Sequence, residues 1–312
     1  MRPSVNDRSA RGCAMALACL ALACRGTAPV SLPAARPQAP RDGLPPKVAL
    51  VLGGGAARGF AHVGVLRVFE EEGIPVELIV GTSVGSLVGA MYADGKDSHQ
   101  LERIAVALDR DDFFDFSAGR AVFGTGLAKG ERLARFVERH VSRRRIEELP
   151  IPFAAIATDL DTGERVVLTE GSVVEAVRAS CAIPGIFEPI RARGRLLVDG
   201  GVVANLPVAV ARELGADVVI AVDVTAVAGR AAPESFVDVL FRAINILVHE
   251  DTAEAARLAD VVIIPAIGEI ALLEFDEKDR ARAAGIAATR AALPAIREAL
   301  ARTRAGAGAA PR

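Results

Sequence analysis

Two short apolar runs, each ending in glycines and followed by a helical pattern, constrain the fold of this chain most. The first run, Lys47–Leu52, leads through three glycines to a helix from about Phe60 to Glu72. The second run, Val76–Val80, is followed by helical spacing over Val84–Tyr92. Strands that alternate with helices pair in parallel, because each helix carries the chain back to where the next strand starts. The sequence therefore predicts an α/β fold with a mainly parallel central sheet.

The alternation continues along the chain. We expect further helices over residues 98–109, 129–140, 173–180, 208–214, 235–258 and 276–302. We expect a hairpin over residues 153–159 and 164–169, and strands over residues 195–198, 218–224 and 261–265. No Pro/Gly-rich break follows Lys47, which favours one domain over residues 47–305 and a disordered tail over residues 306–312.

Composition excludes some classes of function. The formal net charge is −2, so no strong excess of basic residues is present to bind the phosphates of a nucleic acid. No group of residues has metal-ligand spacing, and we expect neither a metal nor another cofactor. Oligomeric state is left open by the sequence.

The first residues have the pattern of an export signal. Arg2, Arg8 and Arg11 precede an uncharged run, Cys13–Cys24, which has the length of a signal-peptide core and is too short to span a membrane comfortably. We expect a signal peptide over residues 1–23. The last four residues of the run, Ala-Leu-Ala-Cys, resemble a lipobox, although Ala and Leu stand where an aliphatic and a small residue are usual. Lipidation of Cys24 and ordinary cleavage at an Ala-x-Ala site both remain open.

Residues 24–46 are rich in Pro, Ala and Arg and predict a flexible linker. Three of the four cysteines lie in the N-terminal segment, which leaves Cys181 alone in the domain and excludes an internal disulfide. We expect an exported protein of the periplasm or outer membrane, held at the membrane by a lipid anchor or by its substrate.

The strongest local signal is Gly81-Thr-Ser83-Val-Gly85 between the second strand and its helix. A nucleophile elbow needs small residues two places either side of the serine, because larger side chains would collide in so tight a turn. The helix behind Ser83 offers N–H groups and its positive end to a developing oxyanion. An ordinary helix-capping serine is the alternative.

A second signal is Gly53-Gly54-Gly55-Ala-Ala-Arg58 behind the first strand. Successive glycines leave backbone N–H groups open to a phosphate or an oxyanion. A dinucleotide site would need a small residue where Arg58 stands and an acidic ribose ligand about twenty residues further on. Because Arg58 and the serine turn occupy those places, the nucleotide reading is the weaker one.

A third signal is Asp199-Gly200-Gly201 at the end of a short strand, where the glycines allow a sharp turn and a carboxylate that faces a cleft. Taken alone, an ordinary turn aspartate explains this motif better. The chain has four histidines, and only His249 follows the hydrolase order of serine, acid and histidine. Because His249 lies in an expected helix instead of a loop, we favour a carboxylate acting directly on the serine.

Together these motifs resemble the patatin-like phospholipase family, in particular its bacterial branch. The resemblance covers roughly Lys47–Leu300, and its carriers are the blocks Gly53–Leu66, Gly81–Ser86, Arg178–Phe187 and Asp199–Gly201. It implies a three-layer α/β/α fold and a Ser–Asp dyad that needs no histidine.

Residue by residue, the resemblance implies Ser83 as nucleophile and Asp199 as base. It implies Gly53, Gly54, Gly55 and Arg58 as the oxyanion loop, supported by the motif glycines Gly81, Gly85, Gly200 and Gly201. Relative to the plant-type pattern, the loop carries one extra residue before Arg58. Which N–H groups face the oxyanion is therefore left open.

The function that the resemblance implies is hydrolysis of acyl esters of phospholipids or lysophospholipids through an acyl-enzyme. One alternative is acyl transfer to an alcohol or thiol through the same intermediate. Another is a non-enzymatic module that binds a lipid or a nucleotide in the glycine loop.

Overall fold

The computed structural model describes residues 46–116, 125–225 and 252–307 apart from 269, 272 and 273, together with five positions between 239 and 249. The expected signal peptide, Cys24 and the expected linker lie outside the described residues. So do most of the helix expected over residues 235–258 and the last residues of the expected tail. These expectations stay predictions.

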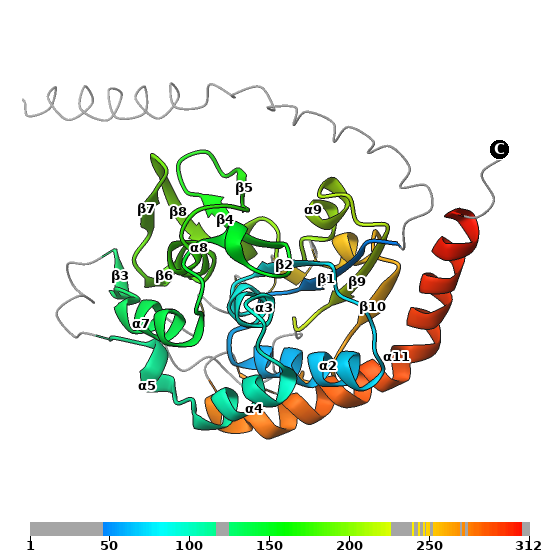
Figure 1. Ribbon diagram of the computed structural model, residues 1–312. Coiled ribbons are helices and arrows are strands. Elements are labelled where there is room, and N and C mark those ends of the chain that lie inside the picture. The colour runs from blue at the N-terminus through cyan, green and yellow to red at the C-terminus, as the bar shows by residue number, and fades with distance from the viewer. Residues whose placement is uncertain are drawn as a thin grey trace, which may run out of the picture. The chain divides into compact units, whose positions relative to one another are not determined.

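An eight-stranded sheet forms the centre of the domain, in the order β10-β9-β1-β2-β4-β8-β7 with β5 beside β4 (Figure 1). Its first five strands in this order are parallel. They are β10 (Val261–Ile263), β9 (Val218–Val222), β1 (Val48–Leu52), β2 (Leu78–Thr82) and β4 (Phe153–Asp159). The predicted α/β class with a mainly parallel sheet is confirmed.

Three strands run antiparallel to their neighbours. They are β5 (Arg165–Leu168), β7 (Ile190–Ala192) and β8 (Arg195–Asp199). The β4–β5 hairpin lies where the sequence predicts it, whereas β7 was not expected. A separate small sheet pairs β3 (Gly126–Ala128) with β6 (Gly185–Phe187), and neither strand was expected.

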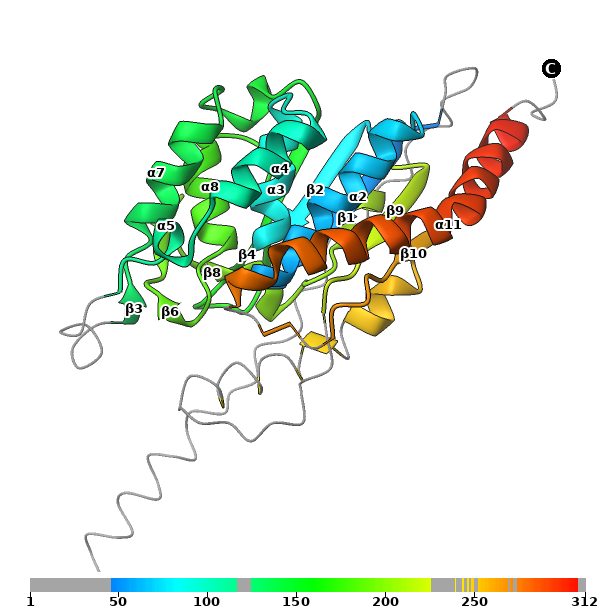
Figure 2. The same cartoon turned by 90° about the horizontal axis from the view of Figure 1, so that it is seen from below.

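Helices cover both faces of the sheet, which gives three layers (Figures 1 and 2). One face carries α2 (Phe60–Glu71), α3 (Val84–Ala93), α4 (Ser98–Ala107), α7 (Glu131–His140), α8 (Val173–Ser180) and α11 (Lys278–Ala307), with the one-turn α5 (Arg110–Phe113) beside α7. The opposite face carries α9 (Val208–Glu213) and residues 255–259. The expected three-layer α/β/α fold is confirmed.

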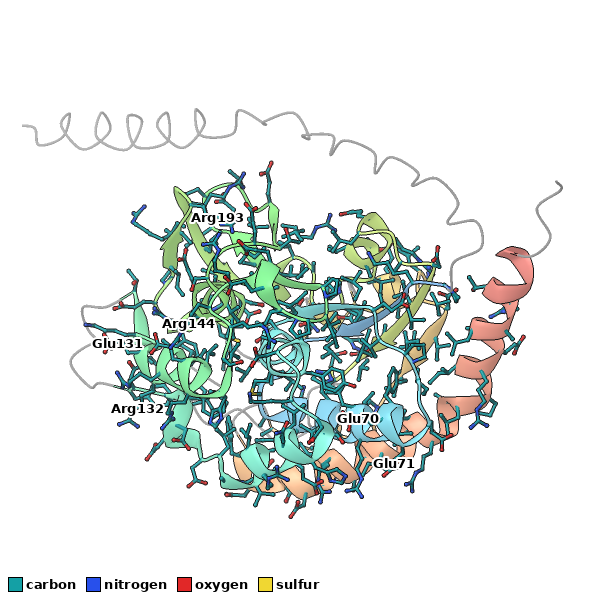
Figure 3. The ribbon with its side chains drawn as sticks, viewed as in Figure 1. Glu70, Glu71, Glu131, Arg132, Arg144 and Arg193 are labelled. Atoms are coloured by element: carbon teal, nitrogen blue, oxygen red, sulfur yellow. The ribbon has the colours of Figure 1, made fainter. Side chains whose placement is uncertain are left out.

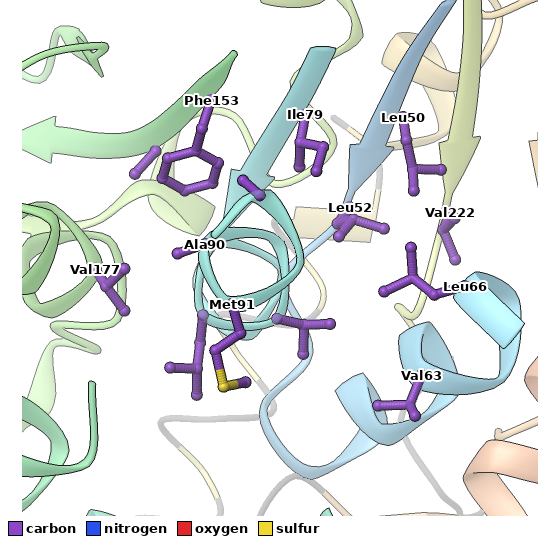
Figure 4. Packing of buried hydrophobic residues seen from close by; sticks show 14 of the residues in the cluster. Leu50, Leu52, Val63, Leu66, Ile79, Ala90, Met91, Phe153, Val177 and Val222 are labelled. Atoms are coloured by element: carbon purple, nitrogen blue, oxygen red, sulfur yellow. The ribbon is translucent and has the colours of Figure 1, made fainter. Parts of the chain in front are cut away.

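Alternation along the strands explains the two layers of core. Val48, Leu50 and Leu52 of β1 belong to the larger cluster, and Ala49 and Val51 belong to the cluster on the other face. Successive side chains of a strand point to opposite faces, so an all-apolar strand serves both cores. Figure 4 shows the larger cluster, in which side chains of the sheet point toward α2 and α3.

Many charged side chains lie at the periphery of the domain. Figure 3 labels examples on α2, at the start of α7 and at the turn between β7 and β8. Among the described residues, no helix combines the length and the apolar character needed to cross a bilayer.

The longest helix, α11, crosses α2 at very short range. A Cβ placed on Gly64 of α2 would lie 2.1 Å from the Arg282 carbonyl oxygen, and one on Gly285 of α11 would lie 2.1 Å from the Ala61 carbonyl oxygen. Each helix therefore has a glycine at the crossing, and the backbone of the other helix packs directly against it.

We predict that Gly64→Ala destabilises the protein by about 2 kcal/mol, because backbone would have to move to admit the methyl group. At a helix glycine outside such a crossing, the same substitution would increase the free energy of unfolding, since alanine stabilises a helix interior by roughly 0.5–1 kcal/mol relative to glycine. Chemical denaturation measures the difference. The control is Gly268→Ala, where the added Cβ meets no atom of the described chain within 4 Å apart from its chain neighbours. A Gly64 variant as stable as this control would contradict the prediction.

Candidate active site

Two strands end head to head on one edge of β4. β2 pairs with β4 as far as Thr82, which lies opposite Ile156. The next residue of β4, Ala157, lies opposite Asp199, the last residue of β8. β5 occupies the other edge of β4 over these residues, so β2 and β8 share one edge. Ser83 directly follows Thr82 and is thereby brought to Asp199.

Ser83 occupies a sharp turn between β2 and α3. Its backbone has φ 53° and ψ −126°, a strained conformation that costs a non-glycine residue about 1–3 kcal/mol. A Cβ on Gly81 would lie 2.5 Å from the Gly85 carbonyl oxygen, and one on Gly85 would lie 2.1 Å from the Leu52 carbonyl oxygen. No side chain fits at either position. The turn has the geometry of a nucleophile elbow.

Hydrogen bonds hold this turn in place. The Ser83 N–H donates to Ser180 Oγ at 2.9 Å, and the Ser83 carbonyl accepts from Ser86 Oγ at 2.7 Å. The side chains of Ser180 and Ser86 are fully buried. The backbone of Ser83 is therefore fixed on both sides.

The turn after β8 aims the Asp199 carboxyl at the same junction. A Cβ on Gly200 would lie 2.3 Å from the Ile156 carbonyl oxygen, so only glycine lets the chain pass this close to β4. The Gly201 N–H donates to Asp199 Oδ1 at 2.7 Å, and Thr158 Oγ1 donates to the Asp199 carbonyl at 2.9 Å. Both glycines of this motif thus position the carboxyl.

The environment of Asp199 favours its neutral form. The residue is 5% exposed, and burial raises its pKa to about 7. The Gly201 N–H and the contact with the Ser83 side chain act in the opposite direction, because each stabilises the carboxylate. A carboxyl with a pKa near neutrality that lies beside a serine side chain is suited to accept the proton of its hydroxyl.

Four hydrogen bonds hold the first two glycines of the loop behind β1. The Gly53 N–H donates to the Val222 carbonyl at 3.0 Å, and the Gly53 carbonyl is 2.9 Å from His62 Nε2. Burial lowers the pKa of His62 to about 4, so the ring is neutral and its Nε2–H donates. The Gly54 N–H donates to the Asn205 carbonyl, and Asn205 Nδ2 donates to the Gly54 carbonyl, each at 3.3 Å.

These bonds bear on the question that the sequence analysis leaves open, namely which N–H groups of the loop can face an oxyanion. The N–H groups of Gly53 and Gly54 are taken by acceptors inside the fold, so these two residues form the base of the loop and do not donate to an oxyanion. Within the described part of the chain, the N–H groups of Gly55 and Val84 have no acceptor. A Cβ on Gly54 would lie 3.1 Å from Ser83 Cβ, which shows that the loop runs beside the serine.

Arg58, the last predicted member of the loop, is 4% exposed. Its Nε donates to the Ile270 carbonyl at 2.7 Å, which ties the loop to the segment before α11. Burial lowers the pKa of Arg58. This arrangement agrees with a supporting role for the guanidinium.

An apolar cavity opens on one side of Ser83. Four residues that line it lie on one face of α3 at spacings of three and four, namely Val84, Leu87, Val88 and Met91. The cavity therefore follows α3 away from Ser83 for roughly 10 Å. Its other walls come mainly from α4, α7 and a group of phenylalanines, which are Phe60, Phe113, Phe114, Phe136, Phe187 and Phe275.

A second cavity with more polar groups in its walls opens on the other side of Ser83. Asp199, Asn205 and the glycine loop line it. Of the residues that the structure describes, only Ser83, Ala56 and Ile183 line both cavities. Ser83 thus lies between the apolar cavity and a second one, the polar cavity, whose walls combine apolar residues with polar side chains.

None of the histidines lines either cavity. His62 is buried behind the glycine loop, and His249, the candidate for a triad, is exposed. The described part of the chain also holds no group of three His, Cys, Asp or Glu side chains placed to bind a metal ion. Sequence reasoning gave no separate role to Ser180 or Asn205, although both hold the backbone of the site.

Fold and site together define an α/β protein with a strained serine turn facing a buried carboxyl. A family model described as patatin-like phospholipase matches residues 50–212, about half of the chain. The chain belongs to the patatin-like phospholipase family, as its motifs indicate.

Curated relatives share this region. An uncharacterized NTE family protein of Mycobacterium tuberculosis is 38% identical over 182 residues, which cover 58% of this chain and 50% of the relative. Patatin-like phospholipase domain-containing protein 6 of Homo sapiens is 38% identical over 181 residues, which cover 57% of this chain and 13% of that protein. The chain thus spans about half the length of the mycobacterial relative and a small part of the human one.

Among solved structures, VipD from Legionella pneumophila has a similar fold. The TM-score is 0.52 at 14% sequence identity, with 82% of this chain and 68% of VipD covered. At this identity the likeness concerns the fold alone.

The raised pKa of Asp199 has a consequence for stability. In the unfolded chain the carboxyl titrates near 4 and in the fold near 7. Between these values the folded protein holds the extra proton, so its stability falls as pH rises through this window.

We therefore predict that Asp199→Asn, which keeps the shape but removes the buried charge, stabilises the protein at pH 8 by up to about 4 kcal/mol. The gain should vanish near pH 4. Urea unfolding at both pH values measures it, and Asp161→Asn, an exposed aspartate, is the control. A gain of the same size at both pH values would contradict the prediction.

Proposed function

We propose that this protein is a serine hydrolase that cleaves acyl esters of phospholipids or lysophospholipids. The observation that carries the proposal is the junction on β4, where the strained Ser83 meets a buried carboxyl at the mouth of an apolar cavity. Membership of the patatin-like phospholipase family supports the substrate class.

In the proposed mechanism the acyl chain occupies the apolar cavity and the alcohol portion occupies the polar cavity. The Asp199 carboxylate accepts the proton of Ser83 Oγ as this oxygen attacks the ester carbonyl carbon. Asp199 then gives the proton to the departing alcohol oxygen, which leaves an acyl group on Ser83. Water attacks this acyl-enzyme with Asp199 as the base, and the fatty acid leaves as Ser83 regains its proton.

The N–H groups of Gly55 and Val84 are our candidates for the oxyanion hole. Both lack an acceptor within the described part of the chain, and Val84 N–H lies at the positive end of α3. Each such donor contributes on the order of 3 kcal/mol to the transition state in comparable sites.

The dyad makes a prediction about activity. With a 4-nitrophenyl acyl ester, kcat/KM should fall about tenfold per pH unit below pH 7, because the carboxyl must be ionised to act as a base. Ser83→Ala and Asp199→Asn should each reduce turnover by about 10³-fold or more.

The control for these variants is His249→Ala, which should keep the parent rate because His249 is exposed and lines neither cavity. Undiminished turnover by Ser83→Ala would remove the hydrolase proposal. Loss of turnover in the histidine variant alone would replace the dyad with a triad.

The apolar cavity makes a second prediction. Ala105 of α4 lines this cavity, whereas its neighbour Val106 is 60% exposed. Ala105→Leu should shorten the preferred acyl chain, lowering kcat/KM for long-chain esters at least tenfold more than for butyryl esters, because the added methyl groups fill space along α3. Val106→Leu is the control. Equal losses for long and short chains would contradict an acyl role for the cavity.

A further inference from the structure

The end of α8 and the residues that directly follow it reach both strand ends at the junction on β4. Ser180 Oγ accepts from the Ser83 N–H at 2.9 Å, and two residues later the Ala182 carbonyl accepts from the Asp199 N–H at 2.9 Å. Ser180 is fully buried, and so is its bond to Ser83. Three successive residues of one helix end thus connect the backbones of the serine and the aspartate.

The Ser180 hydroxyl provides a hydrogen-bond acceptor for the Ser83 N–H, which has no partner in the sheet. Pairing with β4 ends at Thr82 on β2, so the N–H of Ser83 lies beyond the β2–β4 ladder. A buried N–H without an acceptor costs about 1–3 kcal/mol, and Ser83 already holds a strained backbone at positive φ. Without the Ser180 hydroxyl, a relaxed turn that exposes this N–H would compete with the reactive one.

We propose that Ser180 is a positioning residue, whose hydroxyl holds Ser83 at the distance from Asp199 that proton transfer requires. The inference rests on the proposed hydrolase function and deepens it, because Ser180 acts through the backbone of the nucleophile. The end of α8 then fixes the distance between the backbones of the nucleophile and the base.

The test is Ser180→Ala, assayed with the same 4-nitrophenyl ester. We expect kcat to fall about 10–100-fold with KM within twofold of the parent, since a misplacement near 1 Å has effects of this size on chemistry. The acid limb of kcat/KM should move to higher pH, because the contact with Ser83 lowers the pKa of Asp199 and would be weakened.

The matched control is Ser172→Ala. Ser172 caps the other end of α8, where its hydroxyl accepts from the Glu175 N–H, and none of its hydrogen bonds in the described part of the chain reaches Ser83 or Asp199. This variant should lose about as much melting temperature as Ser180→Ala but keep kcat and the pH profile of the parent.

If Ser180→Ala does not fold, Ser180→Thr and Ser180→Val carry the same comparison, because these side chains have equal shape and differ in the hydroxyl. The threonine variant should turn over at least tenfold faster than the valine variant. Turnover by Ser180→Ala within threefold of the parent, with an unmoved acid limb, would overturn the inference. So would equal rates for the threonine and valine variants. If Ser83→Ala kept the parent rate, the hydrolase proposal itself would fail instead.

Discussion

The edge of β4 on which β2 and β8 meet is the constraint on which the site depends. One strand arrives parallel and the other antiparallel, so both present their carboxyl ends to the same point. A parallel sheet alone would leave these ends on separate edges of the ladder. The antiparallel direction of β8 is therefore essential to the site, because it places Asp199 beside Ser83.

Such close convergence requires positions without side chains, and the structure meets this need with glycine at each contact. Gly81 and Gly85 admit the serine turn, Gly200 admits the passage over β4, and Gly54 lies against Ser83 and Asn205. The site is also unfavourable in itself, since it holds a strained serine and a buried carboxyl. The large apolar clusters on both sheet faces stabilise the fold enough to hold these two features in place.

Local patterns predicted much of this. The first strand, its helix, the serine turn and the β4–β5 hairpin all lie within two residues of their expected positions, because apolar periodicity and glycines act locally. The direction of β8 could not be read in this way, since three residues of β4 far away in sequence decide it. Strands as short as β6 and β7 contain too few residues to show an alternation of apolar and polar side chains. The sequence also did not reveal the roles of Ser180 and Asn205. Each holds the backbone of a residue far away in the sequence, and neither belongs to a recognisable local motif.

The hydrogen bonds around Ser83 also divide the nearby N–H groups by function. Those that prolong the strands are taken, by Val222 for Gly53, by Ser180 for Ser83 and by Ala182 for Asp199. Those that begin the following helical segments, on Gly55 and Val84, have no acceptor in the described chain, because the first N–H groups of a helix have no partner within it. The geometry of a strand-to-helix turn therefore leaves hydrogen-bonded N–H groups on its strand side and unpaired N–H groups on its helix side. Two such turns lie side by side, so their unpaired N–H groups lie next to the Ser83 hydroxyl, and the Ser180 hydroxyl of α8 holds the backbone of Ser83 in this arrangement.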